Sequence, residues 1–358
     1  MKKFLSLILS LVMVLGVSTV TFADVVADNG DVSSVDLAKI YKLANNGVKN
    51  PAETFNFTVT NESVSDSQYT FDGANGSEIM PSISPNTYEI SFTEGEAALA
   101  GDKNTTAIAL PTYNHVGIFT YKITETASNT AGVEYDAKPI YLKVTVTEEN
   151  GQKVRHVVFH YGTVNGSKTE GITNIYSASS LDIKKEVTGN MGEKDRYFKV
   201  DVTLNAPTEI TDTATVVKPV KSTISITGGS NSNNPTTVKF ADGENTKTIT
   251  LLLKDDETIT LGNLPVGVTY TVKEADYTTD ANGKYDKPKY NDVEDTQKQG
   301  ITGTVDKDNK EVKITNNRGR DVDTGIFVDN LPYIMILAVV VVGGGAFIIK
   351  RRMASNNN

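Results

Sequence analysis

Cysteine and tryptophan are absent from the 358 residues, and histidine occurs only three times. Without cysteine the chain can form neither a disulfide nor a thiolate metal site, so any covalent cross-link must use other side chains. Lysine and arginine are scattered and the formal net charge is −9, which argues against a nucleic-acid partner. His156 and His160 lack a third ligand, and the sequence contains no phosphate loop and no nucleophile elbow. The sequence therefore predicts no metal site, no cofactor and no enzyme.

Long hydrophobic runs are confined to the two ends of the chain. Two lysines, an apolar run and a small-residue cleavage site ending at Ala23 predict a signal peptide over residues 1–23, and hence an exported protein. Residues 331–349 are uncharged and, at about 1.5 Å per residue in a helix, long enough to cross a bilayer. Because three basic residues follow, we expect residues 350–358 to be a cytoplasmic tail and the preceding chain to lie outside the cell.

Between these ends, apolar and polar residues alternate with a period of two, for example over residues 55–59, 141–146 and 222–226. Turn-forming pairs such as Asp72-Gly73 separate the alternating stretches, and no long window has helical periodicity. These patterns predict an all-β fold. About 300 residues are too many for one β-sandwich of roughly 100 residues, so we expect two sandwiches in a row.

An internal repeat appears when Lys42 is aligned with Lys185. A phenylalanine follows each lysine after thirteen residues, a Tyr-x-Ile/Val-x-Glu segment comes later in each copy, and Ile-Thr-Asn closes both copies. The repeat predicts two copies of one domain, over residues 24–178 and 179–320. The matched trios are Lys42, Glu125 and Asn174 in the first copy, and Lys185, Glu274 and Asn316 in the second.

These three residue types can form an amide bond if they meet in a dry core. Burial favours the neutral, nucleophilic lysine and the protonated glutamic acid, which can polarise the asparagine carboxamide and carry protons as ammonia leaves. Such a reaction is self-performed and occurs once per domain, so it is not enzyme catalysis. The competing interpretation is that the charged residues are solvated and the asparagines form turns. The matched positions in both copies favour the amide.

The pentapeptide Asp-Val-Asp-Thr-Gly, residues 321–325, stands just before the apolar run and the basic tail. That order is typical of a sortase sorting signal, in which a transpeptidase cuts between threonine and glycine, here Thr324 and Gly325. The apolar segment would hold the precursor in the membrane until cleavage. The pentapeptide differs from the commoner Leu-Pro-x-Thr-Gly form and is similar to pilin variants of the type x-Val-x-Thr-Gly.

With these motifs the chain resembles the Gram-positive backbone pilins, most closely the two-domain streptococcal T-antigen type. The resemblance implies two tandem immunoglobulin-like (CnaB-type) β-sandwich domains. It also implies isopeptide bonds Lys42–Asn174, with Glu125 as the catalytic acid, and Lys185–Asn316, with Glu274 in that role. The implied partners are a sortase, further pilin subunits, peptidoglycan, and minor pilins or a host surface ligand.

In that family a sortase joins the C-terminal threonine of one subunit to a lysine in the first domain of the next. The corresponding residue here is Lys168, six residues before Asn174. The resemblance thus predicts a structural subunit of an adhesive, wall-anchored pilus on the cell surface. Two alternatives stay open: Lys168 as an ordinary solvated hairpin lysine, and the whole chain as a monomeric wall-anchored adhesin that binds host matrix.

Overall fold

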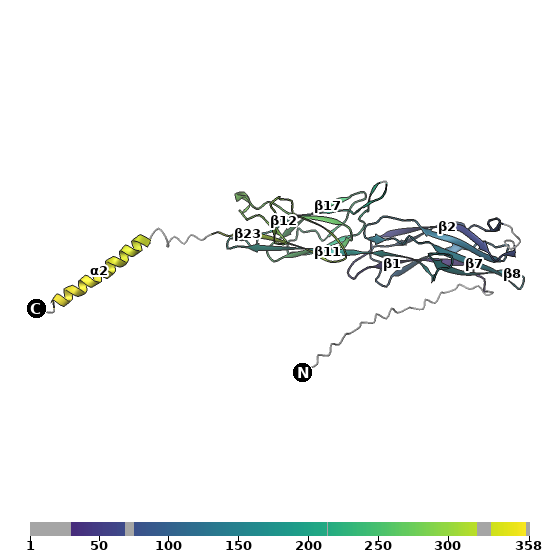
Figure 1. Ribbon diagram of the computed structural model, residues 1–358, viewed down its shortest axis with the longest axis horizontal. Coiled ribbons are helices and arrows are strands. Elements are labelled where there is room, and N and C mark those ends of the chain that lie inside the picture. The colour runs from purple at the N-terminus through teal and green to yellow at the C-terminus, as the bar shows by residue number, and fades with distance from the viewer. Residues whose placement is uncertain (1–29, 69–74, 213, 321–330, 356–358) are drawn as a thin grey trace, which may run out of the picture.

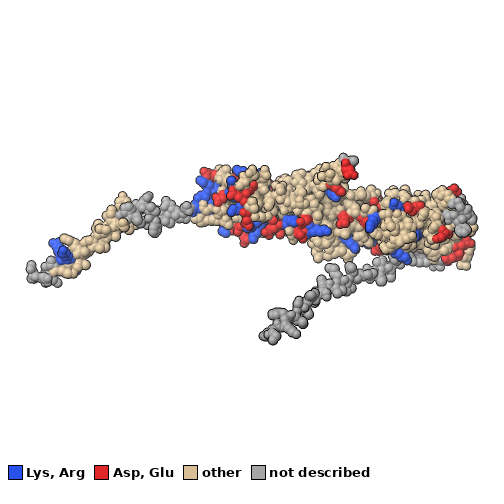
Figure 2. Space-filling view, in the orientation of Figure 1, with Lys and Arg blue, Asp and Glu red and all other residues tan. Residues whose placement is uncertain are grey.

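The structure, a computed structural model, describes residues 30–68, 75–212, 214–320 and 331–355. Two β-rich domains follow one another along the long axis of the molecule, and helix α2 (Leu331–Ser355) lies apart from them (Figure 1). Lysine and arginine side chains are interspersed with aspartate and glutamate over the face shown in Figure 2. The predicted signal peptide, 1–23, and sorting motif, 321–325, lie outside the described residues.

The first domain is a sandwich of two sheets. Four strands form one sheet, in the order β4 (Asp102–Ala109), β1 (Ser34–Leu43), β10 (Gly171–Tyr176) and β6 (Val133–Glu134). Six strands form the other, in the order β3 (Thr87–Phe92), β2 (Glu53–Ser65), β5 (Gly117–Glu125), β7 (Ile140–Glu149), β8 (Gln152–Tyr161) and β9 (Lys168–Thr169). A short 3-10 helix, η1 (Gly76–Glu78), also belongs to this domain.

The second domain repeats this plan. Seven strands form one sheet, in the order β16 (Thr237–Val238), β15 (Ile224–Gly228), β18 (Thr258–Pro265), β11 (Ala178–Thr188), β23 (Lys310–Asn317), β20 (Lys289–Tyr290) and β21 (Val293–Glu294). The facing sheet consists of β17 (Thr246–Leu253), β12 (Phe198–Asn205), β19 (Thr269–Glu274) and β22 (Ile301–Thr304). A hairpin of β13 (Thr208–Ile210) and β14 (Thr215–Val217) and a 3-10 helix, η2 (Asp280–Asn282), complete it. The predicted all-β, tandem-sandwich fold is confirmed.

The first and last strands of each domain are neighbours and run parallel. β1 pairs with β10 in the first domain, and β11 pairs with β23 in the second. Each domain thus begins and ends in the same sheet, although most of its sequence lies between these strands. A bond between the two strands would enclose almost the whole domain.

Period-two alternation explains how the sheets form two separate cores. In β2, residues Phe55, Phe57 and Val59 are buried while the residues between them are exposed or half-buried, which is the pattern of a strand with one face toward the core. Aromatic rings fill the first core, where Tyr41 meets Phe55 edge-on with ring centroids 5.2 Å apart. Mostly aliphatic side chains fill the second core.

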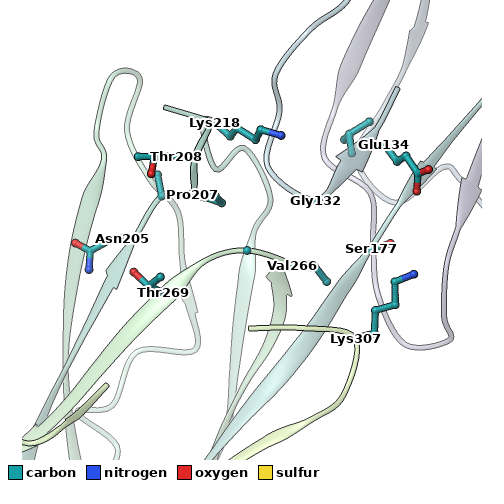
Figure 3. A pocket seen from close by; sticks show the side chains of 13 residues that line it. Gly132, Glu134, Ser177, Asn205, Pro207, Thr208, Lys218, Val266, Thr269 and Lys307 are labelled. Carbon is teal, nitrogen blue, oxygen red and sulfur yellow. The ribbon is translucent and has the colours of Figure 1, made fainter. Parts of the chain in front are cut away.

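The two domains are in direct contact. Only Ser177 separates β10 from β11, and the side chain of Asn263 forms two hydrogen bonds of 3.0 Å with the backbone of Lys49. Also across the junction, Lys221 forms an ion pair of 3.2 Å with the buried carboxylate of Glu53. A cleft of about 660 Å³ lies between the domains, lined by side chains from both (Figure 3).

Helix α2 contains a segment, Tyr333–Met353, with a mean hydropathy of 2.2 and no burial against the described domains. By length and composition this helix can cross a membrane. The apolar run predicted from the sequence, residues 331–349, lies within α2.

Candidate functional site

The first domain contains a buried cluster of Lys39, Glu125 and Asn174. Lys39 lies on β1, Glu125 at the end of β5 and Asn174 on β10, so both sheets contribute. The Lys39 Nζ forms an ion pair with Glu125 Oε2, and Asn174 Nδ2 donates a hydrogen bond of 2.5 Å to Glu125 Oε1. The lysine and glutamate side chains are 0% and 1% exposed. The carboxyl group therefore touches both groups that an amide would join.

The prediction that Lys42 belongs to this cluster is wrong, because the structure places Lys39 there instead. Leu37, Lys39 and Tyr41 alternate along β1 and are fully buried. Lys42 lies three residues beyond Lys39, an odd number, so its side chain points to the opposite face of the strand and is half-buried.

The error has a definite cause in the loop between the first two strands. Each cluster lysine lies over a phenylalanine, with Lys39 Nζ 4.5 Å from the Phe55 ring centroid and Lys185 Nζ 4.4 Å from that of Phe198. Sixteen residues separate Lys39 from Phe55, whereas thirteen separate Lys185 from Phe198. With equal spacing in the two copies, Lys42 rather than Lys39 falls opposite Lys185. The alternation of Leu37, Lys39 and Tyr41 was the signal in the sequence that could have identified Lys39.

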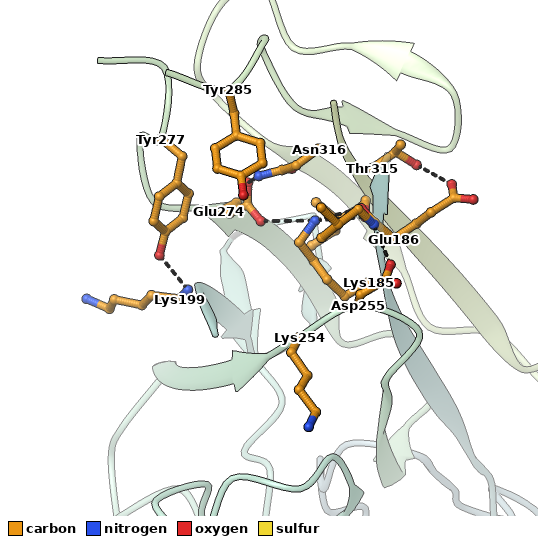
Figure 4. A network of polar contacts seen from close by, with 12 residues as sticks. Lys185, Glu186, Lys199, Lys254, Asp255, Glu274, Tyr277, Tyr285, Thr315 and Asn316 are labelled. Atoms are coloured by element: carbon orange, nitrogen blue, oxygen red, sulfur yellow. Dashed lines mark hydrogen bonds and ion pairs between the residues drawn. The ribbon is translucent and has the colours of Figure 1, made fainter. Parts of the chain in front are cut away.

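In the second domain the structure brings the three predicted residues together (Figure 4). Asn316 Nδ2 donates a 2.7 Å hydrogen bond to Glu274 Oε2, and Lys185 Nζ lies 3.6 Å from Glu274 Oε1. Lys185 Nζ also donates to two backbone carbonyls, those of Glu186 at 2.9 Å and Ile314 at 3.3 Å. The backbone N–H of Glu274 donates to the hydroxyl of Tyr290 at 2.7 Å, which fixes the end of β19.

The strand registers show that the two clusters are equivalent. In each domain the lysine lies two residues before the residue that is paired with the asparagine. The paired residues are Lys39 with Ile172 and Tyr41 with Asn174 in the first domain, and Lys185 with Ile314 and Val187 with Asn316 in the second. The two copies predicted from the sequence thus have the same cluster geometry, and Lys39 of the first domain corresponds to Lys185 of the second.

Burial shifts the pKa values of these groups toward their neutral forms. Desolvation lowers the pKa of Lys39 and of Lys185 to about 8, although the neighbouring glutamates oppose the shift. Desolvation likewise raises the pKa of Glu125 and Glu274 against the influence of the lysines. At pH 7 a lysine with a pKa near 8 is neutral in about a tenth of molecules, far more often than an exposed lysine. Burial therefore makes the neutral amine and the protonated acid more frequent in both clusters than they are for exposed residues.

The two carboxamide oxygens differ in their surroundings. Asn174 Oδ1 accepts a 2.9 Å hydrogen bond from the backbone N–H of Asp136. Asn316 Oδ1 is buried and has no hydrogen-bond partner among the described residues, and the same holds for Glu274 Oε1. A buried carbonyl without a partner is costly, so the second cluster is the less satisfied of the two.

The remaining predicted site residues lie elsewhere. Lys168 is exposed on the short strand β9, opposite His160 of β8. Thr324 and Gly325 lie outside the described residues. His160 Nδ1 is 2.7 Å from the carbonyl oxygen of Gly166, and the described part of the chain has no group of three or more residues suited to hold a metal.

Comparison with known proteins bears directly on this arrangement. Residues 37–177 match the family described as the Spy0128-like isopeptide containing domain, and residues 179–318 match a domain of unknown function, DUF7601. A pilin of Streptococcus pyogenes serotype M1 is 28% identical over 236 residues, which are 63% of this chain and 65% of that relative's length. The crystal structure of the major pilin from Streptococcus pyogenes has a TM-score of 0.50 and 20% identity, covering 80% of this chain and 99% of that chain. The likeness to this crystal structure is a likeness of fold.

The buried lysine, glutamate and asparagine of the first domain thus lie in a part of the chain that matches an isopeptide-containing domain family. Over 236 residues the chain is also similar to a pilin.

Proposed function

We propose that the chain is the repeating subunit of a covalently polymerised surface pilus, and that each of its domains forms one internal lysine–asparagine amide. The observation that carries the proposal is the pair of equivalent buried clusters, Lys39–Glu125–Asn174 and Lys185–Glu274–Asn316. Each cluster connects the first and last strands of its domain, and the first domain matches a family named for isopeptide bonds.

The reaction in each domain is a transamidation. The neutral lysine Nζ attacks the asparagine Cγ, and a carbon–nitrogen bond forms. The glutamic acid accepts the amine proton and returns a proton to Nδ2, the bond from Cγ to Nδ2 breaks, and ammonia leaves. Folding holds the reacting groups in place, an effect worth up to about 7–11 kcal/mol of barrier in well-oriented cases. The acid ends in its starting state, and the product amide keeps the domain cross-linked.

Such a bond suits a subunit that carries load along its length. Tension between the ends of a domain acts on β1 and β10, or on β11 and β23, because these strands lead into and out of each domain. The amide would pass the tension directly between them and spare the hydrogen bonds of the other strands. It would also restrict the unfolded chain as a long-loop disulfide does, by about 4–5 kcal/mol.

Polymerisation and anchoring complete the proposal. A sortase would cut between Thr324 and Gly325 and join Thr324 to Lys168 of the next subunit, and the last threonine would be transferred to peptidoglycan. Two observations support this scheme: Lys168 is exposed on an edge strand, and the apolar helix α2 can hold the precursor in the membrane. Because donor and acceptor lie at different places on the subunit, the contact repeats head to tail and produces a filament.

A denaturing gel of surface extracts tests the polymer. We expect a ladder of high-mass species for the native chain, and its loss for Lys168→Arg, which keeps the charge but removes the acceptor amine. The control is Lys153→Arg, another lysine near the surface of β8, for which the ladder should persist. A native chain that gives only monomer, or a Lys168→Arg chain with an unchanged ladder, would contradict this assignment and favour a monomeric adhesin.

A further inference from the structure

The surroundings of the two asparagine side chains suggest that the two cross-links form at different rates. Asn174 Oδ1 has a donor, the backbone N–H of Asp136, at 2.9 Å. Asn316 Oδ1 is buried without a donor among the described residues. This oxygen is the atom on which negative charge develops when an amine attacks the carboxamide.

The donor in the first domain is held in place by its neighbours. β6 pairs with β10 through Glu134 and Ile175, which brings the following residues beside Asn174. The Asp136 carboxylate accepts hydrogen bonds from the backbone N–H of Lys138 at 3.0 Å and from the Tyr161 hydroxyl at 2.8 Å. The N–H is therefore part of a fixed turn that is already aimed at Oδ1 before reaction.

The corresponding stretch of the second domain is built differently. β20 pairs with β23 through Lys289 and Thr315. One step further along this antiparallel pairing, Pro288 comes opposite Asn316, in the place that Tyr135 has opposite Asn174. The counterpart of Asp136 is therefore Lys289, and among the described residues no donor reaches Asn316 Oδ1.

We propose that the backbone N–H of Asp136 is a catalytic group for the first cross-link, and that the Lys39–Asn174 bond consequently forms before the Lys185–Asn316 bond. This inference rests on the proposed amide chemistry. As Lys39 Nζ bonds to Cγ, the carbonyl electrons move onto Oδ1 and the Asp136 N–H stabilises them. They return as the bond to Nδ2 breaks and ammonia leaves, with Glu125 carrying the proton between the two nitrogens.

Loss of one preorganised donor to a developing oxyanion typically slows a reaction by about 10²–10³-fold. The second cluster has only the glutamic acid to polarise its carboxamide, and Lys185 Nζ lies 3.6 Å from that carboxyl group. We therefore expect the first bond to form on the order of 100-fold faster than the second.

The test follows both bonds in the same molecules. The full chain is synthesised in a cell-free reaction with detergent micelles, samples are quenched in acid at intervals, and proteolysis with mass spectrometry measures each cross-linked peptide. We expect the peptide joining Lys39 to Asn174 to reach half of its final amount well before the peptide joining Lys185 to Asn316. Equal rates, or the reverse order, would overturn the inference. Absence of both peptides at all times would instead refute the proposed amide chemistry.

Two variants identify the group responsible. Asp136→Pro removes the N–H, whereas Asp136→Asn keeps the N–H and leaves a side-chain oxygen that can accept from Lys138 and Tyr161. Asp136→Pro should slow the first bond about 100-fold, and Asp136→Asn should leave it within a few-fold of the native rate. The second bond serves as an internal control for both. Equal first-bond rates in the two variants would contradict the role of the N–H. If proline prevents folding of the first domain, the order of the two bonds in the native chain decides the question.

Discussion

At the residue scale, each cluster depends on a lysine kept out of water next to a carboxyl group. Lys39 and Lys185 are fully buried, and an aromatic ring covers each amine. An ammonium ion in such a place is costly, so burial drives the amine toward its neutral form. The same burial raises the pKa of Glu125 and Glu274. The reactivity that we propose for these residues is thus a consequence of packing.

Substitution of single lysines tests the corrected assignment. Lys39→Ala should raise the mass of the purified protein by one retained ammonia relative to the change expected from the substitution, and should lower the free energy of unfolding by about 4–5 kcal/mol through loss of a long-loop cross-link. Lys42→Ala should retain both cross-links and change stability little. Intact-protein mass and thermal unfolding measure both effects. Retention of the first cross-link in Lys39→Ala would refute its role.

The pKa values predict how bond formation depends on pH. Because the amine must be neutral and burial lowers the pKa of Lys39 to about 8, the neutral fraction rises roughly tenfold per pH unit below 8. The rate of the first cross-link should therefore increase by up to tenfold from pH 6 to pH 7, and it should fall again at higher pH, where Glu125 loses the proton that the reaction needs. Time courses of the Lys39–Asn174 peptide at several pH values check this. A rate that keeps rising toward pH 10.5 would indicate a lysine with an ordinary pKa.

At the element scale, the strands were predictable but their partners were not. Period-two alternation is a local signal, and it indicated the all-β fold and the inward-facing positions. The parallel pairing of β1 with β10 joins segments far apart in the sequence, and no local pattern specifies it. The three extra residues between Lys39 and Phe55 are likewise invisible without the pairing, since loops tolerate insertions at little cost. That is why Asn174 and Glu125 were located and Lys39 was missed.

Stretching single molecules tests the mechanical role of the paired strands. In the native chain, tension should not extend the segments between Lys39 and Asn174 or between Lys185 and Asn316, because each is closed by an amide. In a chain with Glu125→Ala and Glu274→Ala, both domains should unfold under load and lengthen by nearly their full contour. Unfolding of both domains in the native chain would contradict the load-bearing role.

At the scale of the whole molecule, the described domains meet at a junction crossed by side-chain hydrogen bonds and ion pairs. Asn263 binds the backbone of Lys49 and also that of Thr223, and it does so with a left-handed φ of 62°. The buried Glu53 accepts from Thr130 of its own domain and from Lys221 of the other. The sequence predicted a border between the two copies but gave no indication of these contacts, because none of the residues belongs to the repeated motif.

Loss of the junction contacts should make the rod flexible without unfolding either domain. Asn263→Ala removes three hydrogen bonds, of which two cross the junction, at a cost of about 1–3 kcal/mol. We expect a broader distribution of domain orientations in small-angle scattering. Lys239→Ala breaks an exposed ion pair with Glu94 across the same junction and should have almost no effect. Identical scattering from Asn263→Ala and the native chain would show that the junction does not depend on Asn263.

The central claim is that two amides form inside the folded chain, and the intact mass of the purified protein tests it most directly. The account predicts a mass lower than that of the sequence by two molecules of ammonia, with one restored by Glu125→Ala and one by Glu274→Ala. A native protein whose mass equals that of its sequence would contradict the account.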